Sequence, residues 1–200
     1  LELVRARDLA KNGEKILDAL EARFAYPMFV KPAGTGSSVG VSKAVDRQAL
    51  RKALAAAAKF DEKVLVEEFI RGKEIEVAVL GNENPVASVC GEIDSGAEFY
   101  DYDAKYITDT SRAYIPARIP EGLQEEIRKA AVRVFRAIGC QGLSRVDFFA
   151  TEDGRLVLNE INTLPGFTSI SMYPKLFAAS GIPYSRLIDE LLKLAMEAGK

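Results

Sequence analysis

Hydrophobic residues recur along the chain with two different spacings, and each spacing predicts one type of secondary structure. Apolar positions three and four residues apart predict helices over residues 13–24, 46–60, 121–138 and 184–198. Short apolar or alternating runs predict strands over residues 28–30, 63–70, 74–80 and 85–93. Pro27 and Gly139 lie at the ends of the first and third helices, where these residues commonly stop a helix.

Residues 94–120 break this periodicity. A stretch of this length without regular structure is uncommon in a compact domain, and it usually serves as a lid or a binding loop. Tyr100, Tyr102 and Tyr106 would give such a loop aromatic packing, and Lys105 would give it a cation suited to phosphate. Disorder is the alternative, although the aromatic content of the segment favours packing.

Two apolar runs, Arg145–Ala150 and Arg155–Ile161, flank a polar turn and predict a β-hairpin. A symmetric turn would pair Ala150 with Arg155, which places Asp147 opposite Leu158 and Arg145 opposite Glu160. Because side chains alternate along a strand, the polar residues of the hairpin would then share one face. These residues are Arg145, Asp147, Glu160 and Asn162.

On that face Asp147 and Glu160 become diagonal neighbours, close enough for one cation to bridge them. Two carboxylates and the amide oxygen of Asn162 suit a hard ion such as Mg²⁺. A register shifted by one residue would instead put Asn159 on the face. The alternative is a solvated hairpin whose charges bind nothing.

Residues 34–40, with the sequence GTGSSVG, form a candidate anion-binding loop. Glycines and hydroxyl residues allow backbone N–H groups to converge on a phosphate, and Lys31 can add positive charge. The segment matches neither the Walker A motif nor GxGxxG, so a flexible surface loop is the alternative. Val39 and Val41 around Gly40 predict that the loop returns as a strand, and Glu67 could accept from an adenine or a ribose, or be a solvated strand end.

The composition limits the kinds of catalytic site, metal site and partner that the chain can have. With 200 residues, 48% of them hydrophobic, and a net charge of −2, the chain is typical of a soluble globular protein with one domain or two small subdomains. It contains no histidine, which excludes Ser-His-Asp triads and His-ligated zinc sites. Cys90 and Cys140 are expected to be reduced. No transmembrane run, signal-peptide core or basic excess is present, so we expect a cytoplasmic protein that binds neither membrane nor nucleic acid.

Five separated motifs closely resemble the ATP-grasp region of D-alanine–D-alanine ligases, from about Tyr26 onward. They are Lys31-Pro32 before GTGSSVG, EEFIRGKEIEV, FYDYDAKY, SRVDFF and LNEINTLPGFTSIS. The resemblance implies an α+β ATP-grasp fold, in which two subdomains of mainly antiparallel sheet with flanking helices grip a nucleotide. Residues 1–68 would form the smaller subdomain with the glycine-rich loop, and residues 69–200 the larger one with the ω-loop and the metal-binding hairpin.

The resemblance also implies roles for individual residues. Contacts to ATP are implied for Lys31, Gly36, Ser37, Ser38, Val39, Glu67, Glu68, Ile70, Glu74 and Lys105, although Glu68 occupies a position that is often lysine in the family. Catalytic roles are implied for Arg145, Lys105, Tyr106 and Ser37. Mg²⁺ or Mn²⁺ would be held by Asp147, Glu160 and Asn162, and substrate by Arg145, Gly166, Ser171 and Met172.

The implied activity is the ATP- and Mg²⁺-dependent ligation of two D-alanines, through an acylphosphate, for peptidoglycan synthesis. Tyr106 favours D-alanine as the second substrate. The D-Ala–D-Ser and D-Ala–D-Lac ligases of vancomycin resistance are the close alternative, and another ATP-grasp carboxylate–amine ligase or a non-catalytic nucleotide-binding module are more distant ones. Family members carry a preceding substrate domain without counterpart in these residues. We therefore expect the fragment to bind Mg-nucleotide weakly and to ligate poorly alone, and the full-length protein to be a homodimer.

Overall fold

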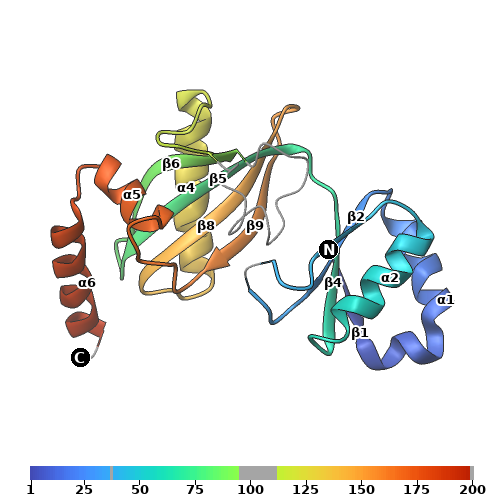
Figure 1. Cartoon of the computed structure of the whole chain (residues 1–200). Coiled ribbons are helices and arrows are strands. Elements are labelled where there is room, and N and C mark those ends of the chain that lie inside the picture. Colours follow the sequence, from blue (N-terminus) through green and yellow to red (C-terminus); the bar gives the residue numbers. More distant parts are fainter. Residues whose placement is uncertain (37, 95–111, 199–200) are drawn as a thin grey trace. The chain divides into compact units, whose positions relative to one another are not determined.

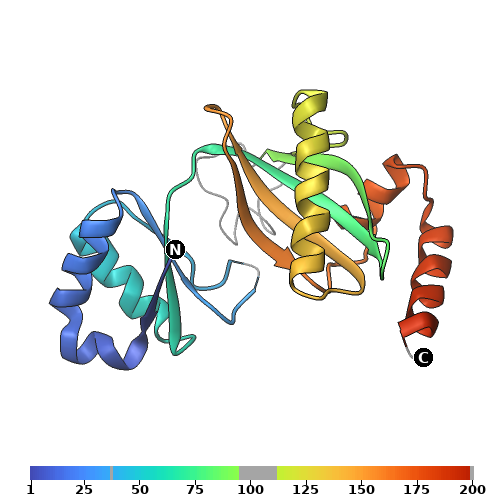
Figure 2. The same ribbon diagram turned by 180° about the vertical axis from the view of Figure 1, so that it is seen from behind.

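The computed structural model describes residues 1–36, 38–94 and 112–198, which divide into two compact units (Figures 1 and 2). Leu1–Ile70 form the first unit, and the described residues from Arg71 onward form the second. The division therefore falls two residues after the boundary suggested by the sequence. Each unit has its own sheet and its own buried core.

The first unit contains a four-stranded antiparallel sheet and two helices that share one core. The strands lie in the order β1 (Glu2–Arg5), β4 (Lys63–Glu68), β2 (Met28–Pro32) and β3 (Ser42–Ala44). The helices are α1 (Ala6–Arg23) and α2 (Arg47–Ala57). The predicted return of the 34–40 loop as a strand is confirmed, because β2 and β3 pair as a hairpin.

The start of the first unit differs from the sequence prediction. Helix α1 begins at Ala6 rather than at residue 13, and the preceding strand β1 was not predicted. Residues 6–13 contain few apolar positions, and the backbone leaves helical geometry at Asn12, with φ −130° and ψ 21°. The periodicity that marks a buried helix face therefore becomes visible only at Ile16 and Leu17.

The second unit contains a five-stranded antiparallel sheet. Its order is β7 (Arg112–Tyr114), β6 (Val86–Asp94), β5 (Gly72–Gly81), β8 (Gly142–Thr151) and β9 (Leu156–Asn162). Its helices are α4 (Glu121–Ala137), α5 (Met172–Ala179) and α6 (Tyr184–Ala198). Strand β7 lies inside the segment 94–120, which was expected to lack regular structure, and that expectation is wrong for these three residues.

Helices cover the two faces of this sheet differently. Helix α4 packs on one face, against alternate residues of β5 and β8 such as Val77 and Val146 (Figure 2). Helix α5 packs on part of the other face, against Ala78 and Leu80. A side chain at Gly91 of β6 would approach Met172 Cε to 2.5 Å, so glycine at this position lets α5 lie close to the sheet. The polar residues of the hairpin occupy the part of this second face beyond α5.

The eight-residue helix α5 was not predicted. Its buried residues form one short apolar block directly after the hydroxyl-rich stretch 167–171, too short to establish a helical period. Both cysteines are free thiols, as expected. No helix in the described part of the chain is long and apolar enough to span a bilayer.

Candidate functional site

The candidate site lies on the hairpin β8–β9, whose register differs from the predicted one. Ala150 pairs with Leu156 rather than with Arg155, because the turn is closed one residue later by Thr151. The Thr151 N–H donates to the Arg155 carbonyl at 3.0 Å, and Gly154 takes a left-handed φ of +84° between them. The predicted symmetric turn is therefore wrong.

A β-bulge then shifts the register a second time. Phe148 pairs with Leu158, whereas Asp147 pairs with Glu160, which leaves Asn159 as the extra residue. The predicted pairs of Asp147 with Leu158 and of Arg145 with Glu160 are wrong for this reason. Each shift alone would send Glu160 to the opposite face, but the two together restore it. Asp147 and Glu160 are thus direct rather than diagonal neighbours.

Arg145 is the centre of the charges on this face. Its guanidinium donates to Asp147 through two parallel bonds, Nε to Oδ1 at 2.8 Å and Nη2 to Oδ2 at 2.7 Å. Glu160 Oε1 lies 4.0 Å from Nη2, and Asn162 is the cross-strand partner of Arg145 on β9. The structure therefore brings together the arginine and the three residues predicted to bind a cation.

Glu76 of β5 belongs to the same group and was missed as a site residue. It is the direct partner of Asp147 across β5–β8, and its Oε2 lies 3.3 Å from Arg145 Nε. The alternation of Glu74 and Glu76 with apolar residues indicated a half-buried strand. That pattern could not show that Glu76 faces the site and is only 6% exposed, because this depends on pairing with a strand about seventy residues away.

The carboxylates determine the charge state of Arg145. Burial alone would lower the pKa of its guanidinium, but the hydrogen bonds to Asp147 and the negative charge of Glu76 outweigh burial and raise it. Arg145 is thus a fixed positive charge at any pH that the folded protein meets.

A divalent cation fits the donor chemistry of this face. Asp147, Glu160 and Asn162 offer oxygen atoms, which hard ions prefer, and Asn162 Oδ1 also accepts from the Leu164 N–H at 3.1 Å. Within the described ranges, no three His, Cys, Asp or Glu side chains form a cluster that could hold a metal ion by themselves. Since Arg145 donates to both oxygens of Asp147, a cation bound to this carboxylate would share an oxygen with the guanidinium and weaken that hydrogen bond.

The segment between β9 and the first residue of α5 contains three of the four residues predicted to hold substrate, Gly166, Ser171 and Met172, whereas Arg145 lies on β8. Ser171 Oγ accepts from the Thr168 N–H at 3.0 Å, and the Ser171 N–H donates to the Thr168 carbonyl at 3.0 Å. A side chain at Gly166 would come within 2.9 Å of Ser171 Oγ. Met172, the first residue of α5, is buried beside this turn.

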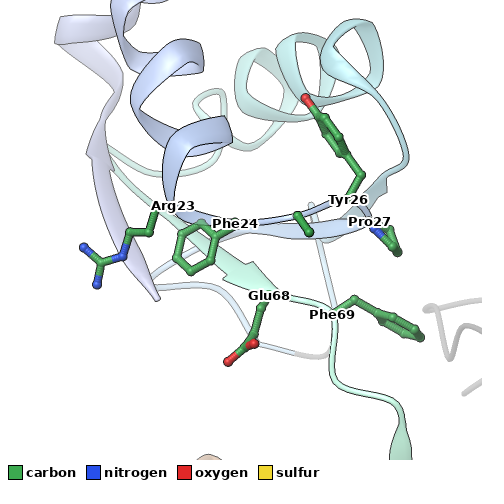
Figure 3. A pocket seen from close by; sticks show the side chains of 7 residues that line it. Arg23, Phe24, Tyr26, Pro27, Glu68 and Phe69 are labelled. Carbon is green, nitrogen blue, oxygen red and sulfur yellow. The ribbon is translucent and has the colours of Figure 1, made fainter.

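In the first unit, the residues predicted to contact nucleotide lie on two faces of the sheet. Lys31 and Glu67 form an ion pair at 2.9 Å on the face that carries Phe29. Glu68 follows Glu67 in the strand and points the other way. With Phe24 and Phe69 it lines a hollow of about 280 Å³ (Figure 3), completed by Arg23, Ala25, Tyr26 and Pro27.

The glycine-rich loop is partly closed on itself. The Val39 N–H donates to the Gly36 carbonyl at 3.1 Å, and Ser38 takes a positive φ of 60°. This bond uses one of the amide groups that the sequence offered for an anion, and the Gly34 N–H, which donates to Asp61 Oδ2 at 2.6 Å, is a second. Ser37, Lys105 and Tyr106 lie outside the described residues. Ile70 ends the first unit, and Glu74 lies in β5 of the second.

Comparison with known proteins identifies the family of this chain. Residues 1–193 match the model of the D-ala D-ala ligase C-terminus. The chain belongs to this family. The D-alanine–D-alanine ligase of Acetivibrio thermocellus is 58% identical over 192 residues, which are 96% of this chain and 51% of that protein. The ligase of Chlorobium chlorochromatii is 53% identical over 97% of this chain and 54% of that protein.

A solved structure agrees with this placement. The crystal structure of the VanG D-Ala:D-Ser ligase from Enterococcus faecalis superposes with a TM-score of 0.86 at 40% identity, covering 96% of this chain and 55% of that one. The α+β ATP-grasp fold expected from the sequence is thereby confirmed. The chain spans about half the length of the D-alanine–D-alanine ligase family members that it matches.

Proposed function

We propose that this chain supplies the nucleotide- and cation-binding part of an ATP-dependent D-alanine–D-alanine ligase of peptidoglycan synthesis. The observation that carries the proposal is the position of Arg145. In a member of this ligase family, it is a half-buried cation held by Asp147 beside Glu160 and Asn162. A module that only binds nucleotide has no need of a guanidinium fixed so firmly beside its cation ligands.

The proposed reaction has two steps. The carboxylate of one D-alanine attacks the γ-phosphate of ATP, giving an acylphosphate and ADP, and the amine of the second D-alanine then displaces phosphate. Arg145 stabilises the negative charge that develops on the tetrahedral intermediate, since its own charge is fixed. Mg²⁺ or Mn²⁺, held by Asp147, Glu160 and Asn162, would supply neutralisation of phosphate charge.

The other predicted residues keep their proposed roles. Lys31 and the loop 34–40, with Ser37, would contact the phosphates, while Glu67, Glu68, Ile70 and Glu74 would contact the nucleoside. Lys105 and Tyr106 would close over the substrates. The turn containing Gly166 and Ser171, with Met172, would hold the second substrate. A homodimer in the cytoplasm, without nucleic acid or membrane partners, remains our prediction.

A second candidate is ligation of D-alanine to D-serine, because the VanG enzyme with that specificity is 40% identical to this chain. Two relatives with the D-Ala–D-Ala name are more similar than VanG, at 53% and 58% identity, and so favour D-alanine. Both candidates share the nucleotide and cation chemistry, and they differ only in the second substrate.

The test uses the complete gene product with ATP, Mg²⁺ and D-alanine, offered alone or with D-serine or D-lactate, and identifies products by mass spectrometry. We expect D-alanyl-D-alanine as the main product and ADP release in step with it. D-alanyl-D-serine as the main product would favour the second candidate. ATP binding without dipeptide formation would overturn the proposal.

The Arg145→Ala variant separates an enzyme from a binding module. We expect kcat to fall at least ~100-fold while the Kd for ATP changes less than about threefold, since a group that acts on the intermediate contributes little to ground-state binding. The steady-state rate of ADP release measures kcat, and equilibrium titration with ATP measures the Kd. Equal losses in both would mean that Arg145 serves binding rather than catalysis.

A further inference from the structure

Three carboxylates stand in one row across the second sheet. Glu76, Asp147 and Glu160 are direct partners on the neighbouring strands β5, β8 and β9, and such partners lie about 5 Å apart. Arg145 lies two residues from Asp147 on the same face and contacts all three. When ionised, the four groups carry a net charge of −2, which a divalent cation would balance.

The three carboxylates differ in their access to solvent. The side chain of Glu160 is 56% exposed, whereas those of Asp147 and Glu76 are 3% and 7% exposed. A cation arriving from solvent meets Glu160 first and Asp147 next. Glu76 lies farthest from this route, on the far side of Asp147, with its Oε2 against Arg145 Nε.

Cation binding and the present Arg145 geometry compete for Asp147. Arg145 uses both Asp147 oxygens, so a cation bound to one of them shares that oxygen with the guanidinium and weakens their hydrogen bond. Because the arginine side chain is flexible, its guanidinium would then lose its fixed orientation unless a second acceptor held it. Glu76 lies 3.3 Å from Nε and is outside the predicted ligand set, and so it is placed to be that acceptor.

We propose that Glu76 is a positioning residue, which holds the Arg145 guanidinium toward the reacting groups while Asp147 and Glu160 bind the divalent cation. Glu76 would act only through Arg145 and would touch neither the cation nor the substrates. The kinetic consequence rests on the proposed ligase function. The contact itself does not depend on that function.

The contact is tested directly by hydrogen exchange at Arg145 Nε–H, followed by NMR of the complete gene product labelled with ¹⁵N-arginine. The signal is assigned by its absence in Arg145→Lys. With saturating Mg-ADP, we expect exchange to be at least ~10-fold faster in Glu76→Gln than in wild type, because a charged acceptor becomes a neutral one. Equal rates would overturn the proposal.

Mn²⁺ titration followed by electron paramagnetic resonance distinguishes positioning from ligation. We expect the Kd for Mn²⁺ in Glu76→Gln to stay within about threefold of wild type. A Kd raised tenfold or more would make Glu76 a cation ligand and would overturn the proposal.

Kinetics complete the test. In Glu76→Gln we expect kcat to fall ~10- to 100-fold, the size expected for a charged hydrogen bond lost in the transition state, with the KM for ATP little changed. In an Arg145→Lys background the same change should alter kcat less than about threefold. A full loss in that background would show action independent of Arg145 and would overturn the proposal.

The matched control is Glu92→Gln, which also replaces a buried carboxylate of this sheet but one paired with Arg118 and Lys73. Glu92→Gln should leave hydrogen exchange at Arg145 Nε–H unchanged. Faster exchange in this control too would show general loosening of the sheet and would overturn the proposal.

If Glu76→Gln does not fold, Glu76→Asp keeps the charge and shortens the side chain, and faster Nε–H exchange is again expected. If the wild type makes no dipeptide, the ligase function fails, while the exchange measurement still tests the contact.

Discussion

Two buried serines, on the two strands that flank β5, show how the effect of one hydroxyl on stability depends on its hydrogen-bond partners. Ser88 Oγ accepts from the Ala78 N–H at 3.0 Å, at the bulge where β5 and β6 shift register, and it donates to the Val89 carbonyl at 2.7 Å. Ser144 Oγ has no hydrogen-bond partner within the described ranges of the chain. The first hydroxyl accepts from a backbone N–H that the bulge leaves without a strand partner. The second is buried without a hydrogen bond, which lowers the free energy of unfolding.

Replacing each serine by alanine should therefore have opposite effects. Ser88→Ala leaves the Ala78 N–H buried without an acceptor and should lower the free energy of unfolding by about 1–3 kcal/mol. Ser144→Ala removes an unpaired polar atom and should leave this free energy unchanged or raise it by up to ~1 kcal/mol. Urea unfolding at constant m-value measures both, and an equal loss in the two variants would contradict the argument.

At the scale of elements, a charge network joins the two helices of the first unit. Arg47 of α2 donates to Glu14 at 3.0 Å and to Asp18 at 2.7 Å, and it also pairs with Glu21. Hydrogen bonds from Arg51 and then from Arg47 lower the pKa of Glu14 from 4.5 to about 2. Because the folded pKa lies below the unfolded one, the stabilisation is present above pH 4.5 and is lost as the pH falls toward 2.

Glu14→Gln tests this network. We expect its Tm to lie below that of wild type at pH 7 and the difference to shrink between pH 4.5 and 2, as wild-type Glu14 becomes protonated. The difference should also shrink in about 0.5 M NaCl, because these groups are exposed and salt screens them. Glu152→Gln, a change in the exposed hairpin turn, is the control. A difference between wild type and Glu14→Gln that does not vary with pH would point to packing instead.

Elements with a repeated apolar pattern could be predicted from the sequence, whereas pairings between them could not. Helix α4 shows its buried face in Ile127, Ala130 and Ala131, and its start matches the prediction. The β8–β9 register depended on whether Thr151 or Ala150 closes the turn and on a bulge at Asn159, which leave no mark in hydrophobic periodicity. The polar face was nevertheless predicted correctly, because two single-residue errors cancel in a structure with period two.

At the scale of the whole molecule, the chain is half the length of the ligases that it matches. We expect these 200 residues to bind Mg-ATP in calorimetric titration, and the double variant Asp147→Asn/Glu160→Gln to lose that binding. We expect dipeptide synthesis by the chain to be at least ~1,000-fold slower than by the full-length A. thermocellus relative, since substrate positioning contributes factors of this size. Comparable rates would refute this expectation.

The family could be recognised from five short motifs because each combines glycines, charges and apolar residues in a fixed order. The role of Glu76 could not, because the sequence motif around it, KEIEV, has the pattern of any half-buried strand. Only the alignment of β5 beside β8 makes it a neighbour of Arg145. A residue whose role is marked by its neighbours in the sequence can thus be identified from the sequence. A residue whose role depends on a neighbour in the folded structure cannot.

The bulge at Asn159 has a consequence for the gene. Removal of the Asn159 codon would make Leu158 and Glu160 consecutive, still opposite Phe148 and Asp147, so the hairpin would lose its extra residue and keep both carboxylates on one face. Removal of the Ile161 codon would place Asn162 opposite Val146, on the face that packs against α4. We expect a codon-deletion library selected for Mg-ATP binding to retain the first deletion and to lose the second. We thus expect natural relatives that differ in the length of β9 to have lost or gained a residue at the bulge rather than at Ile161.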